Sequence, residues 1–363
     1  MKIVVLQDRL RAGGTERQAV FLARSFAAAG HETVVVTFRP GGALAPDLEA
    51  AGVRHRSLQP VDLGLDWFAP GLCAKINAER PDVVLCMGRM ANCHAGHLQR
   101  TLSRVAVVAT VRTGKALPFF YRNALRTVHG IVTNSEFAKR ELIAPASPTA
   151  PIAVIPNALL VPVLSESEPP VPAEPPYRIL CIAMFRKEKC HFDLIEICSR
   201  IPRTPGWHLD LVGEGSERAA CEARVRELGI ADCVSFHGWS RDPAPFYRGA
   251  AVAVLASRRE SLPNFLVEAQ SAGLPVVAYD VGGCAECFAD GSSGLLIAPG
   301  DEAAFRAALS SLLSNPARRT AMARTARDRA ATLFNPERSV RAHLDFFECL
   351  LLRSPRASAA VAG

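Results

Sequence analysis

The chain of 363 residues is too long for one ordinary α/β domain and fits two domains of about 150–170 residues each. Hydrophobic residues make up 49% of it, which is enough for two buried cores. No run of about 18 uninterrupted apolar residues occurs, which argues against a membrane-spanning helix. Aromatic residues make up only 7%, and no basic stripe interleaved with aromatic residues appears, so nucleic acid is disfavoured as a partner.

The charge is distributed unevenly along the chain. Residues 1–160 carry 19 Lys and Arg against 11 Asp and Glu, a net charge of +8, whereas residues 161–363 carry a net charge of −1. An excess confined to one half favours an anionic partner there, such as a membrane surface or a phosphate-bearing acceptor. A dispersed, solvated surface is the alternative.

Short β-branched runs alternate with helical stretches, which is typical of parallel sheets covered on both faces. The first half predicts strands near residues 2–7, 32–38, 82–86, 105–110, 130–134 and 152–156, with a helix at 16–29 among those between them. The second half predicts strands near residues 179–184, 208–212, 233–237, 251–256, 275–279 and 294–298. Two further helices are expected between about 301 and 333. The fold class is therefore α/β, with two Rossmann-like, doubly wound domains.

The domain boundaries follow from a proline-rich segment. Residues 161–176 contain six prolines, which exclude a helix or a central strand, and are predicted to link a first domain at 1–160 to a second at 177–334. A final helix at 335–353 could cross back to the first domain, and the tail at 354–363 is expected to be disordered. Because both halves share one architecture, a ligand is expected between them, outside the carboxyl ends of the strands.

The segment Glu260–Glu268, ESLPNFLVE, follows an apolar strand and leads into a helix. The first-turn N–H groups of that helix, those of Asn264, Phe265 and Leu266, are predicted to form an anion site for a diphosphate. Glu268 is placed to accept hydrogen bonds from ribose hydroxyls, and Glu260 to reach a sugar. A solvated glutamate and a helix pair are the alternative.

This segment resembles the E-x7-E motif of retaining glycosyltransferases of family 4, which have the GT-B fold. The resemblance extends over most of the chain, through Gly13–Glu16 (GGTE), Val132–Ser135 (VTNS), Val154–Asn157 (VIPN), Leu211–Gly215 (LVGEG) and Phe236–Trp239 (FHGW). It implies two domains facing each other across a cleft, the first binding the acceptor and the second the nucleotide-sugar. Further donor contacts are expected from Gly14, Gly213, Glu214 and Trp239.

The resemblance also implies positive charge on the leaving diphosphate. Lys189 matches the family lysine, whereas Met184 occupies the position of the family arginine, and Arg186 is the nearest replacement. Such enzymes retain anomeric configuration without an evident carboxylate nucleophile, and the departing phosphate is thought to take the acceptor proton. No divalent metal or other cofactor is expected, and no acidic ligand pair is placed on a strand end. Lys189→Ala is expected to abolish transfer with little loss of fold, as an exposed loop cation would.

In the first domain, Arg112 stands where many members place a histidine. It could bind an acceptor phosphate or the donor phosphate, and an exposed arginine beyond a strand is the alternative. His94 and His97 have metal-like spacing without a visible third ligand, and Cys284 and Cys287 form a CxxC without a second pair.

The sequence thus predicts a retaining hexosyl- or N-acetylhexosaminyltransferase that uses a UDP- or GDP-sugar. The expected acceptor is a glycan, lipid-linked or polysaccharide molecule, and the expected location is the cytoplasm, with peripheral contact between the basic first domain and the inner membrane face. A catalytically inactive donor-binding subunit is the alternative. A nicotinamide-dependent dehydrogenase is disfavoured because Gly13-Gly14 follows the first strand without a G-x-G-x-x-G pattern.

Overall fold

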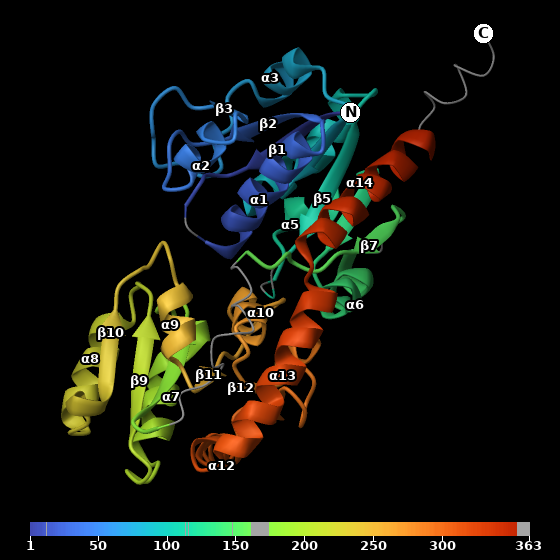
Figure 1. Ribbon diagram of the computed structural model, residues 1–363. Helices are drawn as coiled ribbons and strands as arrows, with labels where there is room; N and C mark the ends of the chain where they lie inside the picture. Colours follow the sequence, from blue (N-terminus) through green and yellow to red (C-terminus); the bar gives the residue numbers. More distant parts are fainter. Residues whose placement is uncertain (12, 113, 115, 147, 161–173, 354–363) are drawn as a thin grey trace. The chain divides into compact units, whose positions relative to one another are not determined.

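A computed structural model describes the whole chain except residues 12, 113, 115, 147, 161–173 and 354–363 (Figure 1). The chain divides into two compact units. The first contains Met1–Leu160 together with the C-terminal segment that begins at Pro336, and the second contains the residues that lie between and end at Asn335. The predicted linker falls largely, and the predicted tail entirely, outside the described residues.

The first unit is built on a seven-stranded sheet in which every pair of neighbours is parallel. In spatial order the strands are β3 (Arg54–Ser57), β2 (Glu32–Thr37), β1 (Lys2–Gln7), β4 (Val83–Cys86), β5 (Ala106–Val111), β6 (Gly130–Thr133) and β7 (Ile152–Val154). The strand order reverses between β1 and β4. That reversal is the topological switch point of a doubly wound sheet, where ligands usually bind at the carboxyl ends of the strands.

Helices pack against both faces of this sheet. They are α1 (Gly14–Ala28), α2 (Ala45–Glu49), α3 (Leu72–Glu79), α4 (Arg89–Thr101), α5 (Phe119–Ala124), α6 (Glu136–Ala146) and α14 (Pro336–Arg353). The central strands β1 and β4 have apolar side chains that are buried on both sides of the sheet. This explains why they appear in the sequence as continuous apolar runs rather than as alternating ones.

The second unit repeats the architecture with six parallel strands. Their order is β10 (Val234–His237), β9 (Trp207–Val212), β8 (Tyr177–Ile182), β11 (Val252–Leu255), β12 (Val276–Tyr279) and β13 (Gly294–Ile297), so its switch point lies between β8 and β11. The helices are α7 (His191–Ser199), α8 (Arg218–Glu227), α9 (Ala244–Gly249), α10 (Asn264–Ser271), α11 (Cys284–Cys287), α12 (Glu302–Leu313) and α13 (Pro316–Leu333).

The predicted fold class, two Rossmann-like parallel α/β domains, is confirmed, and each predicted strand lies within about three residues of an observed one. Strand β3 was not among the predicted strands. Its residues Arg54, His55, Arg56 and Ser57 include no apolar side chain. Because β3 is an edge strand that pairs only with β2, it needs no buried apolar face to be held in the sheet.

Helix α14 belongs to the first unit, where it packs against α1 and β5 (Figure 1). Phe347 is fully buried and meets Phe26 of α1 edge to face, with ring centroids 5.8 Å apart. His343 is also fully buried, and its Nδ1 lies 2.7 Å from the Ser339 carbonyl oxygen. Burial, and to a smaller extent the charge of Arg112, lowers the pKa of His343 to about 3, so the folded protein keeps this ring neutral.

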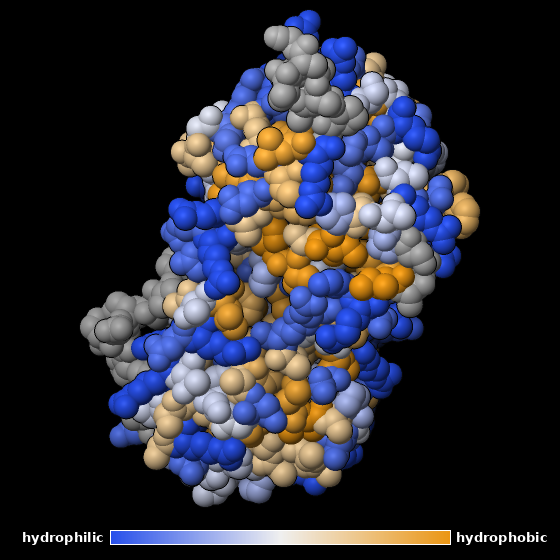
Figure 2. Space-filling view, turned by 90° about the vertical axis from the view of Figure 1, so that its right-hand side faces the viewer, coloured by the Kyte–Doolittle hydropathy of each residue, from blue (hydrophilic) through white to orange (hydrophobic). Residues whose placement is uncertain are grey.

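Figure 2 shows hydrophilic and hydrophobic residues mixed over the face that it presents. Among the described helices, none combines the length and the apolar content needed to cross a bilayer.

The buried His343 predicts an acid-sensitive stability. Its folded pKa lies below the unfolded value of 6.5, so as the pH falls below that value the unfolded chain binds a proton that the folded chain refuses. The stability present at neutral pH is therefore lost on acidification, by about 2 kcal/mol from this group between about pH 7 and pH 5. In His343→Gln, whose amide can still hydrogen-bond, urea unfolding at several pH values should show a correspondingly flatter profile.

The matched control is His97→Gln, because His97 is exposed and should leave the profile of the wild type unchanged. If His343→Gln follows the wild-type pH profile, the neutral buried ring makes no contribution to acid sensitivity.

Candidate functional site

The site lies at the carboxyl edge of the second sheet, at its switch point. Residues 183–189 follow β8, and residues 256–263 follow β11, its neighbour in the sheet. A backbone hydrogen bond joins the two loops, since the N–H of Arg258 donates to the carbonyl of Glu188 (2.9 Å). The sequence-predicted side chains of both loops therefore meet at the place where a doubly wound sheet binds its ligand.

Lys189 and Glu260 form an ion pair at this point. Lys189 ends a short 3-10 helix, η1 (Lys187–Lys189), and its Nζ donates to Oε1 of Glu260 (2.5 Å). The lysine side chain is 21% exposed and the glutamate side chain only 8%. In the described part of the chain, Lys189 is the only side chain that forms a hydrogen bond or ion pair with Glu260. The pair supplies a cation and a carboxylate, both fixed in position.

The expectation that Lys189 is an exposed loop cation is wrong. Its partner carboxylate is buried, and removing one member of a buried pair leaves an uncompensated charge that costs about 3 kcal/mol or more when burial is complete. The residual exposure of Lys189 reduces this cost. Replacing Lys189 alone is therefore expected to lower stability as well as to alter chemistry.

A third loop approaches the backbone of Glu260 closely. Gly282, after β12, has a φ of +62°, and a Cβ added there would collide with the carbonyl oxygen of Glu260. Only glycine combines this left-handed conformation with such a contact at little cost. The loop after β12 can therefore approach the Glu260 backbone only because residue 282 is a glycine.

Arg186 remains available for a ligand. Its side chain is half-buried and forms no hydrogen bond or ion pair in the described part of the chain, while Met184, the residue at the family arginine position, is 42% exposed. Next to Lys189, His191 is buried and its ring stacks on Phe185, with centroids 4.1 Å apart. Burial, followed by the charge of Lys189, lowers the pKa of His191 to about 4, so this ring adds no positive charge at neutral pH.

Helix α10 begins beside this ion pair, but it offers fewer amides than predicted. Pro263 occupies the N-cap position and provides no side-chain cap. The N–H of Leu266 already donates to the Pro263 carbonyl (3.1 Å), so the prediction that this amide faces an anion is wrong. The side chains of Phe265 and Leu266 are buried, which restricts any ligand contact of Phe265 to its backbone. The amides of Asn264 and Phe265 remain the candidates.

Glu268 lies one turn into α10 and is 5% exposed. The hydroxyl of Tyr247, a fully buried residue of α9, donates to Oε2 of Glu268 (2.7 Å). Tyr247 was not among the predicted site residues, because a lone tyrosine in the sequence does not indicate which carboxylate it contacts. The hydrogen bond fixes the orientation of the carboxylate that is predicted to receive ribose hydroxyls.

The remaining donor-side candidates follow the next two strands along the same edge. Gly213, after β9, has a φ of +145°, and a Cβ there would collide with the carbonyl oxygen of Ala183. Glu214 is exposed and pairs with Arg218 (2.7 Å), and Trp239, after β10, is 51% exposed. The sheet order β10-β9-β8-β11 thus lines up the predicted contacts from Trp239 to Glu260 along one edge.

Of the twelve predicted site residues, ten lie in the second unit, whereas Gly14 and Arg112 lie in the first. Gly14 is the first residue of α1. Arg112, just beyond β5, is half-buried and donates to Oδ1 of Asn157 (2.5 Å) and towards Nε2 of His343 (3.4 Å), so the exposed-arginine alternative is wrong. Burial lowers the pKa of Arg112 to about 10, which leaves it cationic at neutral pH.

The switch point of the first unit is filled by the protein itself. Asp8, just beyond β1, accepts hydrogen bonds from the N–H groups of Met90 (3.0 Å) and Ala91 (2.8 Å) at the start of α4. Burial raises the pKa of Asp8 to about 6 despite these bonds. An internal carboxylate therefore occupies the anion-binding helix start of the first unit.

In the structure, the two patterns with metal-like spacing, His94/His97 and Cys284/Cys287, lie among ordinary protein contacts. The His94 ring meets Phe38 edge to face at 5.5 Å, and its Nε2 lies 3.4 Å from the Trp67 carbonyl oxygen. Cys284 and Cys287 are buried thiols, and burial raises the pKa of Cys284 to about 12. The described residues contain no cluster of three or more His, Cys, Asp or Glu that could hold a metal ion.

Comparison with known sequences gives matches to both halves of the chain. Residues 165–329 match the family described as glycosyl transferases group 1, and residues 12–159 match glycosyltransferase family 4. The chain is 28% identical to the lipopolysaccharide core biosynthesis glycosyltransferase LpsE of Rhizobium meliloti over 342 residues, which cover 92% of this chain and 95% of that protein. It is 40% identical to the Vi polysaccharide biosynthesis protein VipC/TviE of Salmonella typhi over 114 residues, 31% of this chain, but it spans only 20% of that protein.

Solved structures show the same fold. Anabaena HepE, crystallised with UDP and glucose, aligns with a TM-score of 0.81 at 19% identity over 96% of this chain and 100% of that chain. The sucrose-phosphate synthase of Thermosynechococcus elongatus aligns with a TM-score of 0.78 at 20% identity over 98% of this chain and 100% of that chain. The chain is therefore a GT-B glycosyltransferase of the family 4 type.

Proposed function

We propose that the protein transfers a hexosyl or N-acetylhexosaminyl residue from a UDP- or GDP-sugar to a glycan, lipid-linked or polysaccharide acceptor, with retention of configuration and without a divalent metal. The single observation that carries this proposal is the Lys189–Glu260 pair at the switch point of the second unit. The names of the relatives support a role in polysaccharide or lipopolysaccharide assembly. UDP in the HepE crystal favours a UDP-sugar over a GDP-sugar.

In this proposal the leaving diphosphate lies between Lys189, Arg186 and the start of α10. Glu260 holds Lys189 in place before the donor binds, so the cation needs little reorganisation as negative charge develops on the leaving group. The acceptor hydroxyl attacks on the leaving-group face, and the departing phosphate oxygen takes its proton. Cations supplied by the protein perform the neutralisation that a metal ion would otherwise provide. Transfer takes place at the cytoplasmic membrane face.

Two measurements test this function. A thermal-shift screen with UDP, GDP and ADP sugars should show stabilisation by one nucleotide class, because a ligand that binds only the folded state raises its stability. Incubation of that donor with glycan or lipid-linked acceptors, with and without a metal chelator, should then release nucleoside diphosphate and give a product whose anomeric configuration matches the donor. Nucleotide binding without transfer to any acceptor would instead indicate a donor-binding subunit.

The proposed role of Lys189 predicts that its contribution to transfer can be separated from its contribution to stability. Lys189→Ala should lower transfer by about 100-fold or more, as loss of a transition-state charge contact does. It should also lower the melting temperature, because Glu260 is left buried without a partner. Lys189→Met combined with Glu260→Gln removes both charges and should recover most of the melting temperature without recovering transfer.

Lys187→Ala provides the control, since Lys187 is an exposed cation two residues away and should keep both properties. Near-normal transfer by the stable double variant would show that the leaving group is neutralised elsewhere.

The Tyr247–Glu268 hydrogen bond predicts which residues set nucleotide affinity. Glu268→Gln should weaken binding of the nucleoside diphosphate about tenfold, because a charged acceptor for ribose hydroxyls is lost. Tyr247→Phe should weaken it less, since the carboxylate remains but is no longer oriented by the hydroxyl. Isothermal titration with UDP or GDP gives both dissociation constants. Glu302→Gln, at a glutamate of α12 whose side chain is 44% exposed, is the control, and an unchanged constant in Glu268→Gln would rule out the ribose contact.

A further inference from the structure

The first unit has a switch point of its own, between β1 and β4, which the candidate donor site in the second unit does not use. A doubly wound sheet binds its ligand at such a point, outside the carboxyl ends of the strands. Two polar residues stand there, Gln7 at the end of β1 and Asp8 just beyond it. Because a glycosyltransferase has two substrates and most donor candidates lie in the second unit, this point is available to the acceptor.

The side chain of Gln7 has a hydrogen-bond donor without a partner. Gln7 is 2% exposed, and its Oε1 accepts the backbone N–H of Asp8 (2.9 Å), which determines which end of the amide is the oxygen. The other end, Nε2, is buried and forms no hydrogen bond within the described residues. A buried donor that is left unpaired is costly, and its place at a ligand-binding edge indicates that a bound molecule supplies the missing acceptor.

The carboxylate of Asp8 has acceptor positions that the protein does not use. Its two oxygens accept the N–H groups of Met90 and Ala91, one each, at the start of α4. A carboxylate can accept about four hydrogen bonds, so each oxygen can take one more. Asp8 is half-buried, and no Lys or Arg pairs with it in the described part of the chain. The remaining positions suit the hydroxyl groups of a ligand.

The start of α4 holds these two side chains close together. A Cβ added at Gly88 would collide with Oδ1 of Asp8 and with Oε1 of Gln7, so both side chains end beside the same backbone position. Asn92, 1% exposed, donates to the Gly88 carbonyl (2.7 Å) and accepts the N–H of Thr110 (2.9 Å), which ties α4 to β5. A donor and an acceptor are thus fixed side by side, as adjacent hydroxyls of a sugar ring require.

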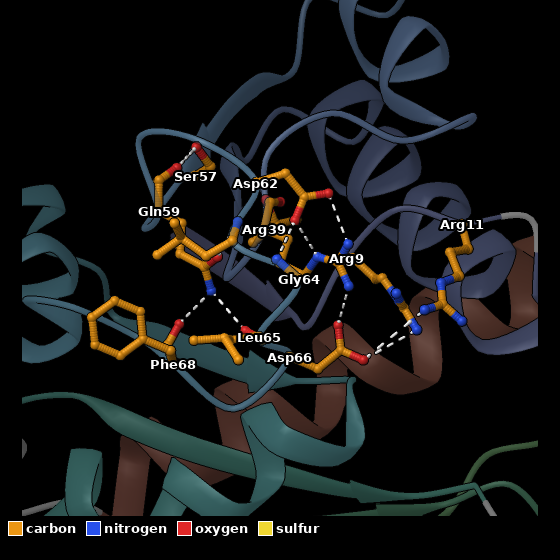
Figure 3. Close-up of polar contacts among 12 residues, drawn as sticks. Arg9, Arg11, Arg39, Ser57, Gln59, Asp62, Gly64, Leu65, Asp66 and Phe68 are labelled. Carbon is orange, nitrogen blue, oxygen red and sulfur yellow. Dashed lines mark hydrogen bonds and ion pairs between the residues drawn. The ribbon is translucent and has the colours of Figure 1, made fainter.

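The charged groups that face Asp8 are acidic. Burial raises the pKa of Asp8 to about 6, and the charges of Glu16 in α1 and of Asp66 in the loop before α3 raise it further. Asp66 is itself paired with Arg9 and Arg39 (Figure 3). The other titratable groups nearby stay uncharged at neutral pH because burial raises their pKa; they are Cys86 of β4, Cys93 of α4 and Tyr121 of α5. A phosphate at this point would meet a carboxylate that no cation balances.

We propose that Gln7 and Asp8 form an acceptor subsite that takes a sugar ring with free hydroxyls and rejects a phosphate. One hydroxyl donates to a carboxylate oxygen of Asp8, and the oxygen of a neighbouring hydroxyl accepts from Nε2 of Gln7. The proposal rests on the proposed function, since it names the class of the acceptor. The excess of Lys and Arg in residues 1–160 favours a phosphate-bearing acceptor, whereas the switch point itself disfavours one.

The proposal gives the acceptor KM a characteristic pH dependence. Only ionised Asp8 is a charged acceptor, and with a pKa of about 6 the ionised fraction falls about tenfold between pH 7 and pH 5. Apparent affinity falls with the binding-competent fraction, so the wild-type KM for an uncharged glycoside should rise about tenfold over this range. In Asp8→Asn this KM should already be about tenfold higher at pH 7 and should change little on acidification.

Transfer assays with matched acceptors test the selectivity. The acceptors are octyl glycosides of hexoses and N-acetylhexosamines, compared with the same compounds phosphorylated at each ring hydroxyl in turn. Phosphorylation at the positions that meet Asp8 should lower the wild-type kcat/KM about tenfold or more. Asp8→Asn should recover transfer to those same compounds, because the start of α4 then lacks its internal anion. The control is Asp82→Asn, at a half-buried aspartate that accepts the N–H of Lys2 (2.9 Å) at the amino edge of the same sheet.

A second variant covers the case in which Asp8→Asn fails to fold. Gln7→Met leaves the Asp8 carboxylate on α4 and removes the unpaired amide, so it should raise the acceptor KM about fivefold and leave the donor KM near that of the wild type. An unchanged acceptor KM in the variants, a wild-type KM independent of pH, or full tolerance of phosphate at every ring position would each overturn the proposal while transfer itself continues. Absence of transfer to any acceptor would overturn the proposed function as well.

Discussion

The arrangement of the candidate site depends on one buried carboxylate, that of Glu260, which is stable only because Lys189 lies against it. The pair joins two loops that follow neighbouring strands, and the hydrogen bond from Arg258 to Glu188 reinforces the same connection. A cation held in this way is already oriented before any ligand arrives. An incoming diphosphate would therefore share Lys189 with Glu260 without having to order a mobile side chain, which is where preorganised electrostatic catalysis gains its advantage.

The two sheets have the same winding, but the helix start at the switch point of the first unit is occupied by a side chain of the protein itself. In the first unit Asp8 fills the helix start at α4, and Gly88 must lack a side chain because a Cβ there would collide with the Asp8 carboxylate. In the second unit the corresponding helix, α10, is preceded by Pro263 at the N-cap position, and a proline side chain has no hydrogen-bond acceptor. A phosphate at the first position would meet an internal anion, which favours the start of α10 for the phosphates of the proposed nucleotide.

The features that could be predicted from the sequence are those that local residue patterns determine. Apolar runs located the central strands of both sheets, and the polar β3 escaped because an edge strand needs no apolar face. The motif positions Lys189 and Glu260 were identified singly, but their pairing joins residues 71 apart and follows only from the fold. Arg112 was likewise predicted, but its contact with His343, which is 231 residues away, follows only from the fold. The amide of Leu266 was assigned wrongly because the sequence does not show that this N–H donates to the Pro263 carbonyl.

Residues 61–68 show why an alternating pattern alone does not place one side of a segment in the core. Strict alternation of apolar and polar residues usually buries the apolar side. Here Asp62 and Asp66 pair with Arg39 (Figure 3), yet these carboxylates are still 49% and 39% exposed, and the apolar side chains between them are exposed as well. Ion pairs, rather than a buried apolar face, therefore hold this segment against the rest of its unit.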